Sequence, residues 1–149
     1  MGKRALSLLL SLTLLSACSP TVTRPELGRN DEPSTVVVYR ETAFNSGLTA
    51  MHFGEGEMRY MLLENNEYAT VEMSPGDHQF LVGTIASGDF EFPVSLVAGT
   101  TTCIKAYANP ANYAKILLPV LFNLTALFKA EVVACPPGNI PEGYELAID

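Results

Sequence analysis

The segment "FEFPVSLV" (residues 90–97) decides the fold class of this chain. Apolar side chains occupy every second position from Phe90 to Leu96, and the positions between them are polar or proline. Because successive residues of a β-strand point to opposite faces, this period of two predicts a strand that buries one face. An amphipathic helix would need apolar residues three and four positions apart. We therefore expect a β-sheet core to which this segment contributes Phe90, Phe92, Val94 and Leu96.

Six further segments of the same kind surround this strand. They are rich in β-branched, aromatic and other apolar residues, and turn-forming residues separate them at intervals of about eight to twelve residues. Such spacing is typical of a β-sandwich or a barrel. The sequence therefore predicts a mainly β fold, a single antiparallel β-sandwich of the Ig-like or transthyretin-like type. The six segments are 35–41, 47–53, 57–64, 67–73, 79–86 and 101–108.

Two connections have recognisable turn chemistry. Asn65-Asn66 separates 57–64 from 67–73, and asparagine tolerates the positive φ that a two-residue type I′ turn requires. These two segments are therefore predicted to form a hairpin. Pro75-Gly76 predicts a second turn, which leads into the strand that follows it.

The segment 109–135 departs from the β pattern. Several of its apolar residues fall at helical spacing, which predicts a helix from about Pro119 to Lys129. Such a helix would be apolar nearly all round, so it either covers one open end of the sandwich or forms a contact surface for a membrane or a partner protein. The apolar run 116–128 has thirteen residues and is too short to span a bilayer. The candidate contact residues are Leu117, Leu118, Leu121, Phe122 and Phe128.

Cys103 and Cys135 are the candidates for a disulfide. Residues 131–135 alternate as a strand, and each cysteine shares one face of its own strand with a charged residue two or four positions away. If 101–108 and 131–135 pair, a cross-strand disulfide is geometrically possible. Two separate buried thiols are the alternative, because a free cysteine packs as a small hydrophobic residue.

The first eighteen residues have the layout of a bacterial lipoprotein signal. Lys3 and Arg4 precede an apolar stretch, 5–15, that has the length of a secretory signal and is too short for a membrane span. Leu15-Ser16-Ala17-Cys18 resembles the bacterial lipobox, which implies a diacylglycerol on the Cys18 thiol and cleavage just before it. We therefore expect residues 1–17 to be a signal peptide; a plain secreted protein is the alternative.

The residues after Cys18 bear on localisation and on domain organisation. In bacterial lipoproteins with this layout an Asp directly after the cysteine is associated with retention in the inner membrane, and this chain has Ser19 there. We expect a lipid anchor at the periplasmic face of the outer membrane, with the inner membrane as the alternative. Residues 18–34 carry three prolines and no apolar period, which predicts a flexible tether. Residues 35–135 should form the domain, and 136–149 a Pro/Gly-rich tail that is loose or laid over it.

The charge of the chain restricts its partners. Removal of residues 1–17 would leave 7 basic and 16 acidic side chains, a formal charge of −9. This charge argues against nucleic-acid binding, because such proteins need a basic face. Electrostatic docking on anionic lipid is disfavoured in the same way, so the acyl chains must supply the anchor.

Several short motifs, taken in order, resemble those of one family. The motifs are "VYR" (38–40), "YATVEM" (68–73), "PGDH" (75–78) and "AGTTTCIKA" (98–106). They resemble a group of small bacterial β-sandwich lipoproteins of unknown function, which is similar in style to the PEGA domains named for their Pro-Glu-Gly-Ala turn. The resemblance covers about residues 35–107 and implies a β-sandwich lipoprotein. It brings no catalytic residues to this chain.

Few residues point to chemistry. His78 follows Asp77, but neighbours on a strand point to opposite faces, so we expect a turn histidine that caps or pairs strands rather than a hydrolytic pair. His52 is expected to be a half-exposed strand residue, and the two histidines give Cys103 and Cys135 no tight zinc-ligand spacing. The sequence has neither a G-x-S-x-G motif nor a phosphate-binding glycine loop before a helix. We predict no catalytic residue, no metal and no cofactor.

These observations give two main hypotheses for function. The first is a non-enzymatic, membrane-anchored lipoprotein whose β-sandwich binds a protein partner or an envelope component. The alternative is a lipoprotein that binds lipid or another hydrophobic ligand through 113–128. An envelope hydrolase that uses His78 is a weaker third hypothesis.

Overall fold

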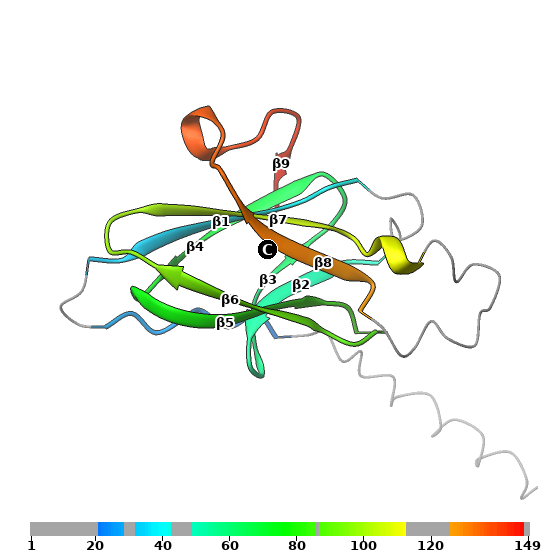
Figure 1. Cartoon of the computed structure of the whole chain (residues 1–149), viewed down its shortest axis with the longest axis horizontal. Coiled ribbons are helices and arrows are strands. Elements are labelled where there is room, and N and C mark those ends of the chain that lie inside the picture. The colour runs from blue at the N-terminus through cyan, green and yellow to red at the C-terminus, as the bar shows by residue number, and fades with distance from the viewer. Residues whose placement is uncertain (1–20, 29–31, 43–48, 86, 113–125, 148–149) are drawn as a thin grey trace, which may run out of the picture.

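The computed structural model of the chain describes residues 21–28, 32–42, 49–85, 87–112 and 126–147, and these are mainly β. Their strands form two sheets that lie face to face (Figure 1). In chain order the strands are β1 (Ser34–Arg40), β2 (Met51–Glu55), β3 (Met58–Leu63), β4 (Glu67–Met73), β5 (Gly76–Gly83), β6 (Phe90–Leu96), β7 (Thr101–Ala108), β8 (Phe128–Val133) and β9 (Glu145–Leu146). A short 3-10 helix, η3 (Pro137–Asn139), precedes β9.

The two sheets differ in the direction of their strands. The four-stranded sheet has the order β3-β2-β5-β6 and is antiparallel throughout. The five-stranded sheet has the order β8-β7-β1-β4-β9, and within it β1 runs parallel to β7 and β4 runs parallel to β9. The prediction of a wholly antiparallel arrangement is therefore wrong for this sheet. Sequence alternation cannot separate the two directions, because both kinds of pairing keep the period of two.

The core lies between the sheets and includes the strand that the sequence identified first. Phe92, Val94 and Leu96 of β6 are buried, whereas Glu91 and Ser95 between them are exposed. The predicted face of this strand is therefore confirmed, with Phe90 half-buried at its start. Aromatic rings join it to its neighbours, since the centroid of the Phe80 ring lies 4.9 Å from that of Phe53 and 6.3 Å from that of Phe92.

The predicted hairpin at Asn65-Asn66 is wrong. β3 pairs with β2, and β4 pairs with β1, so the connection between β3 and β4 passes from one sheet to the other. Only Asn66 has the positive φ, 65°, whereas a type I′ turn needs it at both central residues. The Arg40 side chain lies at this crossing, because its Nη1 donates a hydrogen bond of 2.8 Å to the carbonyl oxygen of Leu63 at the end of β3.

The predicted helix does not reach Lys129. Phe128 begins β8, which pairs antiparallel with β7, and its fully buried ring lies 4.6 Å from the guanidinium carbon of Arg40. A short apolar run suits a buried strand as well as a helix, so its spacing alone could not separate the two. Helical residues in the part of the chain that is described occur only in two 3-10 turns, at 110–112 and at η3, and most of the predicted helix, 119–125, lies outside that part.

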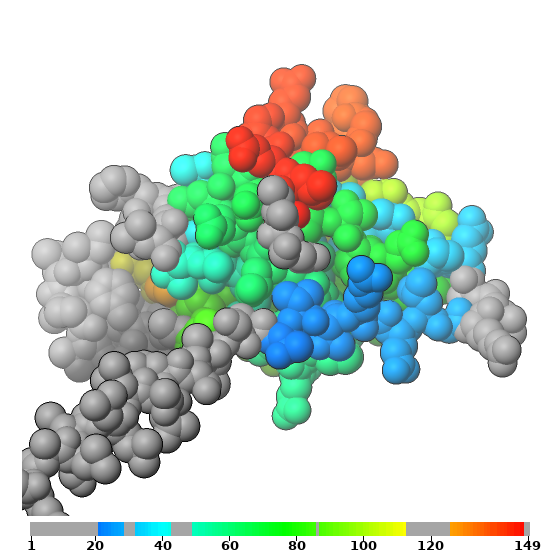
Figure 2. Space-filling model, turned by 180° about the vertical axis from the view of Figure 1, so that it is seen from behind, coloured from blue at the N-terminus to red at the C-terminus, as the bar shows by residue number. Residues whose placement is uncertain are grey.

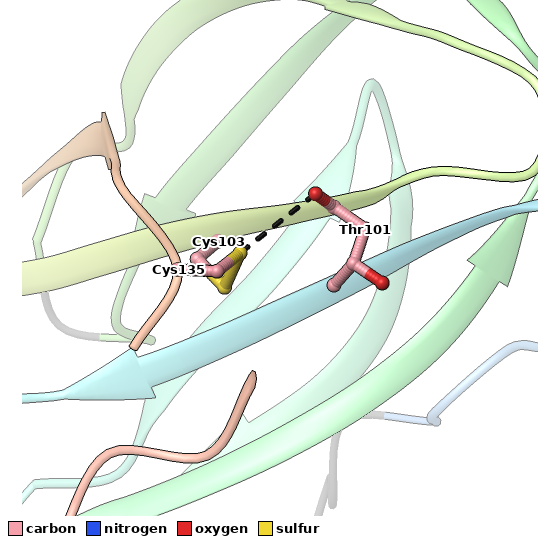
Figure 3. Close-up of a disulfide and its surroundings, with 3 residues drawn as sticks. All are labelled: Thr101, Cys103 and Cys135. Carbon is pink, nitrogen blue, oxygen red and sulfur yellow. Dashed lines mark hydrogen bonds between the residues drawn. A yellow bond between two sulfur atoms is a disulfide. The ribbon is translucent and has the colours of Figure 1, made fainter. Parts of the chain in front are cut away.

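The disulfide between Cys103 and Cys135 is confirmed (Figure 3). β7 and β8 pair as required, with Cys103 opposite Val133, and the two cysteine Cα atoms are 5.2 Å apart. The carbonyl oxygen of Thr101 lies 3.7 Å from Cys135 Sγ; this is a contact only, because a disulfide sulfur carries no hydrogen. Cys103 packs with Val37 on the outer face of the five-stranded sheet, away from the main core.

The residues after β8 form a strap, residues 134–147, which we call the C-terminal strap. It leaves β8 at one edge of the five-stranded sheet and ends as β9 on β4 at the other, above the sheet in Figure 1. The Tyr144 ring meets the Tyr39 ring edge-on with centroids 5.2 Å apart, and the Ala147 amide donates to the Tyr68 carbonyl at 2.9 Å. The tail is thus laid over the domain, and β1 is buried on both faces.

We predict that loss of the disulfide destabilises the domain without unfolding its main core. The bridge joins residues 32 positions apart in sequence, and for a loop of that length chain entropy gives a stabilisation of about 3.7 kcal/mol. Replacing Cys103 and Cys135 together by Ser should lower the free energy of unfolding by about that amount in urea titrations. Reductant should lower it similarly in the original chain and leave the double variant unchanged. An unchanged free energy in the double variant would contradict the prediction.

Candidate functional site

The N-terminal segment, residues 21–28, lies against the open side between β3 and β4. The Thr23 amide donates to the carbonyl oxygen of Arg59 in β3 at 2.7 Å, and the Gly28 amide donates to Ser74 Oγ, just after β4, at 3.0 Å. This part of the predicted flexible tether is therefore attached to the domain, although most of its residues are exposed. The N-terminal segment thus bridges the two sheets, because β3 belongs to the four-stranded sheet and β4 to the five-stranded sheet.

A groove of about 760 Å³ lies between this segment and the end of the C-terminal strap. Buried Tyr60 and Met61 of β3 and half-buried Ala69 and Val71 of β4 supply its apolar lining. Its size falls within the range of small-molecule sites, about 300–1,000 Å³. Figure 2 shows this face of the molecule, with the N-terminal segment in blue lying across the green strands and the C-terminal end in red above it.

The groove exists because β9 is short. β9 pairs with only Glu67 and Tyr68 of β4, so it leaves Ala69, Thr70 and Val71 of the same strand to line the groove. The N-terminal segment closes the other side. The N-terminal segment and the end of the C-terminal strap, which are far apart in the sequence, therefore form the two walls of the groove.

Exposed apolar side chains stand at the rim of the groove. Val22, Leu27 and Leu146 line it and are 37%, 45% and 59% exposed. Arg24 and Glu72, of opposite charge, also line it, so the groove carries no strong net charge from its own residues. A cluster of exposed apolar residues around a hollow usually marks a contact site rather than a solvent surface.

Tyr60, which lines the groove, belongs to a part-buried hydrogen-bond network. The Tyr60 hydroxyl donates to Glu55 Oε2 at 3.3 Å, and burial together with the Glu55 charge raises the pKa of Tyr60 to about 12. His78 Nδ1 lies 3.1 Å from the same carboxylate oxygen, and His78 Nε2 lies 2.9 Å from the carbonyl oxygen of Ser74. Because Ser74 also bonds Gly28, the network reaches the N-terminal segment.

Asp77 and His78 do not form a hydrolytic pair. The Asp77 carboxylate accepts a hydrogen bond from Ser95 Oγ on β6, whereas the His78 ring stacks on the Phe80 ring with centroids 5.2 Å apart and faces Glu55. The two side chains thus point to opposite faces of β5, as their adjacency predicts. His78 acts here as a strand-pairing residue.

A second network holds the turn before β6. His52 Nε2 lies 2.8 Å from Asp89 Oδ1, and Arg59 Nη2 donates to Asp89 Oδ2 at 3.0 Å. His52 is only 5% exposed, so the expectation of a half-exposed residue is wrong. Burial lowers the pKa of His52 below its ordinary value, although Asp89 opposes this effect. Gly83 makes room for the pair, since a Cβ there would lie 2.0 Å from Asp89 Oδ1.

Three of the eight candidate residues from the sequence lie in the described part of the chain. Cys103 and Cys135 are bonded, and Phe128 is a core residue of β8 rather than a surface contact. Cys18, Leu117, Leu118, Leu121 and Phe122 lie outside the described residues. Sequence reasoning missed the groove, because its walls come from opposite ends of the chain and the isolated Val22 and Leu27 show no apolar period.

Within the described ranges, no group of three or more His, Cys, Asp or Glu side chains could hold a metal ion. The same ranges contain no helix that is long and apolar enough to cross a membrane. The sequence matches no protein-family model, and no curated protein matches it.

We predict that Gly83→Ala destabilises the domain. The added Cβ would displace the Asp89 carboxylate and crowd His52 Nε2, which it would approach to 3.0 Å. The free energy of unfolding should fall by about 1–3 kcal/mol, the usual cost of overpacking. Gly88→Ala is the matched control, because its Cβ would meet nothing closer than 4.0 Å. Equal stability of the two variants in urea titrations would contradict this account of Gly83.

The lowered pKa of His52 predicts a loss of stability in acid. Below pH 6.5, the ordinary value, the unfolded chain binds a proton at this residue while the folded chain does not. The free energy of unfolding should therefore fall as the pH drops from 6.5 towards the folded pKa, and this term should be fully retained above 6.5. The His52→Gln variant should show a shallower fall between about pH 7.5 and pH 5.5. Identical slopes in the two proteins would refute the assignment.

Proposed function

We propose that this chain is a non-enzymatic bacterial lipoprotein, anchored through acyl chains on Cys18 at the periplasmic face of the outer membrane. Its domain binds a protein partner or another envelope component. The lipobox-like Leu15-Ser16-Ala17-Cys18 after an apolar stretch supports the anchor. The resemblance to small β-sandwich lipoproteins of PEGA-like style, and an Ig-like or transthyretin-like sandwich as the finer fold class, belong to the same proposal.

The disulfide supports an extracytoplasmic location. Cys103 and Cys135 are bonded on the outer face of a sheet, and bonds of this kind persist mainly in oxidising compartments. If Cys18 carries the lipid, every cysteine of the chain is accounted for, since the sequence has three.

The observation that carries partner binding is the clamp at the two ends of the apolar segment 113–125. Asn109 Nδ2 and Asn112 Nδ2 donate to the carbonyl oxygen of Ala126 at 3.0 and 3.1 Å. Both asparagines are buried, and the Asn109 amide also donates to the Leu127 carbonyl at 2.8 Å. The chain therefore leaves β7 and re-enters β8 at one fixed point.

The sequence between the two ends is suited to a contact. It contains Lys115 as its single charged residue and supplies four of the candidate contact residues, Leu117, Leu118, Leu121 and Phe122. The buried centre of a protein interface is apolar and enriched in aromatic residues, and this segment supplies Phe122 beside its leucines. We therefore propose this segment as the partner contact.

Binding of a lipid or another hydrophobic ligand is the second candidate function. The groove between the N-terminal segment and the C-terminal strap favours it, because Met61 and Val71 give it apolar lining and its rim exposes Val22, Leu27 and Leu146. This site differs from the 113–128 segment that the sequence suggested for the same purpose.

We predict that Leu121→Glu or Phe122→Glu removes the partner. In-cell cross-linking of a C-terminally tagged chain, followed by mass spectrometry, should recover a reproducible envelope protein with the original sequence and at least about tenfold less with either variant. Val97→Glu is the matched control, because Val97 is 62% exposed and lies after β6. All three proteins should have the same thermal midpoint.

Two results would count against partner binding. One is recovery of the same protein at the same yield from the Phe122→Glu variant. The other is a chain that comes alone with phospholipid in excess of its own anchor, which would favour the second candidate function instead. Intact-mass measurement in the same samples would report whether Cys18 is acylated.

A further inference from the structure

The described chain begins at the wall of the groove, close to the proposed anchor. Thr21 is three residues after Cys18, and three residues span at most about 11 Å when fully extended. Two residues later the segment is attached to the domain, through Thr23 to Arg59 and further on through Gly28 to Ser74. An acyl group on Cys18 would therefore keep this side of the domain within a short distance of the bilayer.

The same side exposes apolar side chains whose contact with water is unfavourable. Val22, Leu27 and Leu146 come from the two walls of the groove and are each more than a third exposed. Arg24 and Glu72 line the groove, and exposed Glu26 and Glu145 directly precede Leu27 and Leu146, so the charges beside the rim are mainly acidic and do not attract an anionic membrane surface. Apolar contact, and not electrostatic attraction, is the interaction that this surface can make.

We infer that the rim formed by Val22, Leu27 and Leu146 rests on the bilayer that holds the anchor. The domain then lies with its β3–β4 side towards the membrane, and the acyl chains and interfacial region of that bilayer contact the rim. This inference rests on the proposed function, because it requires the lipid on Cys18. Docking of the rim would fix the orientation of the domain relative to the membrane, whereas an anchor on a flexible tether would not.

The anchor makes weak contacts sufficient. Three partly exposed apolar residues would bind a membrane poorly from solution. A short linker, however, gives an effective concentration in the millimolar range or above, and this turns a weak surface interaction into a populated docked state. Only residues 19–21 lie between Cys18 and Val22 of the rim, which meets this condition.

The orientation agrees with a partner on the other side. β4 and β8 lie at opposite parts of the five-stranded sheet, with β7 and β1 between them. The clamp of Asn109 and Asn112 to Ala126 is next to β8. Docking through the β3–β4 side therefore involves neither β7, nor β8, nor the clamp beside them.

A tryptophan-scanning experiment tests this inference, because the chain contains no tryptophan. The variants are Leu27→Trp and Leu146→Trp at the rim, with Val97→Trp as the matched control. Val97 follows β6, which is at the opposite edge of the four-stranded sheet from β3. Each protein is isolated in its acylated form and reconstituted into phosphatidylcholine vesicles that contain lipids brominated on the acyl chains.

The expected result is selective quenching. Fluorescence of both rim variants should shift to the blue and be quenched at least about twofold more than that of Val97→Trp, and the difference should persist at high salt because the contact is apolar. Equal quenching of all three variants would overturn the inference, and so would a rim signal that disappears in salt. Matching thermal midpoints would confirm that each variant is folded.

The readouts separate failure of the inference from failure of the proposed function. Intact mass and co-flotation with vesicles report the anchor independently of fluorescence. An acylated protein that floats, but whose rim variants are quenched no more than the control, overturns the docking and leaves the lipoprotein assignment standing. A chain without acyl groups on Cys18 overturns both.

Discussion

The buried guanidinium of Arg40 is the interaction on which the arrangement of the two sheets depends. Its Nη1 donates to the carbonyl oxygens of Thr49 and Leu63, both at 2.8 Å, and its Cζ lies 4.6 Å from the centroid of the Phe128 ring. Burial lowers the pKa of Arg40 from its ordinary value, which reflects the cost of keeping this charge out of water. One side chain from β1 thus fixes the chain before β2, the end of β3 and the start of β8. The crossing at Asn65-Asn66 agrees with this, because the end of β3 is held at Arg40 of β1, and β4 pairs with β1 and not with β3.

The N-terminal segment and the C-terminal strap each cover part of the two sheets. The C-terminal strap covers the outer face of β1 and is fixed at its start by the disulfide and at its end by β9. The N-terminal segment covers the side where β3 and β4 meet. The groove is the space that these two segments leave between them, so the site is a product of chain termini rather than of the strands alone. Small domains often have loose ends, whereas here the ends carry the features of functional interest.

Local pattern and long-range structure contributed differently to what could be predicted. Alternation identified the buried face of β6, and the faces of β7 and β8 that bring Cys103 and Cys135 together, because the side-chain direction of a strand is set within two residues. The predicted hairpin at Asn65-Asn66 and the predicted helix ending at Lys129 were wrong. The strands on either side of Asn65-Asn66 pair with other strands, and Phe128 and Lys129 belong to β8, which pairs with β7. Phe128 fits a helical face in sequence and the core position of an edge strand in space. His52 looked half-exposed because nothing near it in sequence reveals Asp89, which lies 37 residues away.

The sequence by itself determined that this chain forms β-strands with defined buried faces, that two of its three cysteines can meet across one strand pair, and that its first residues resemble a lipoprotein signal. These depend on periods and motifs of a few neighbouring residues. Only the tertiary structure decided which strands pair, that β1 runs parallel to β7, and that Val22, Leu27 and Leu146 gather at one groove. The physical reason is that strand pairing and burial depend on contacts between residues far apart in the chain. The free energy of such a contact depends on both residues, so the local sequence around either one does not reveal it.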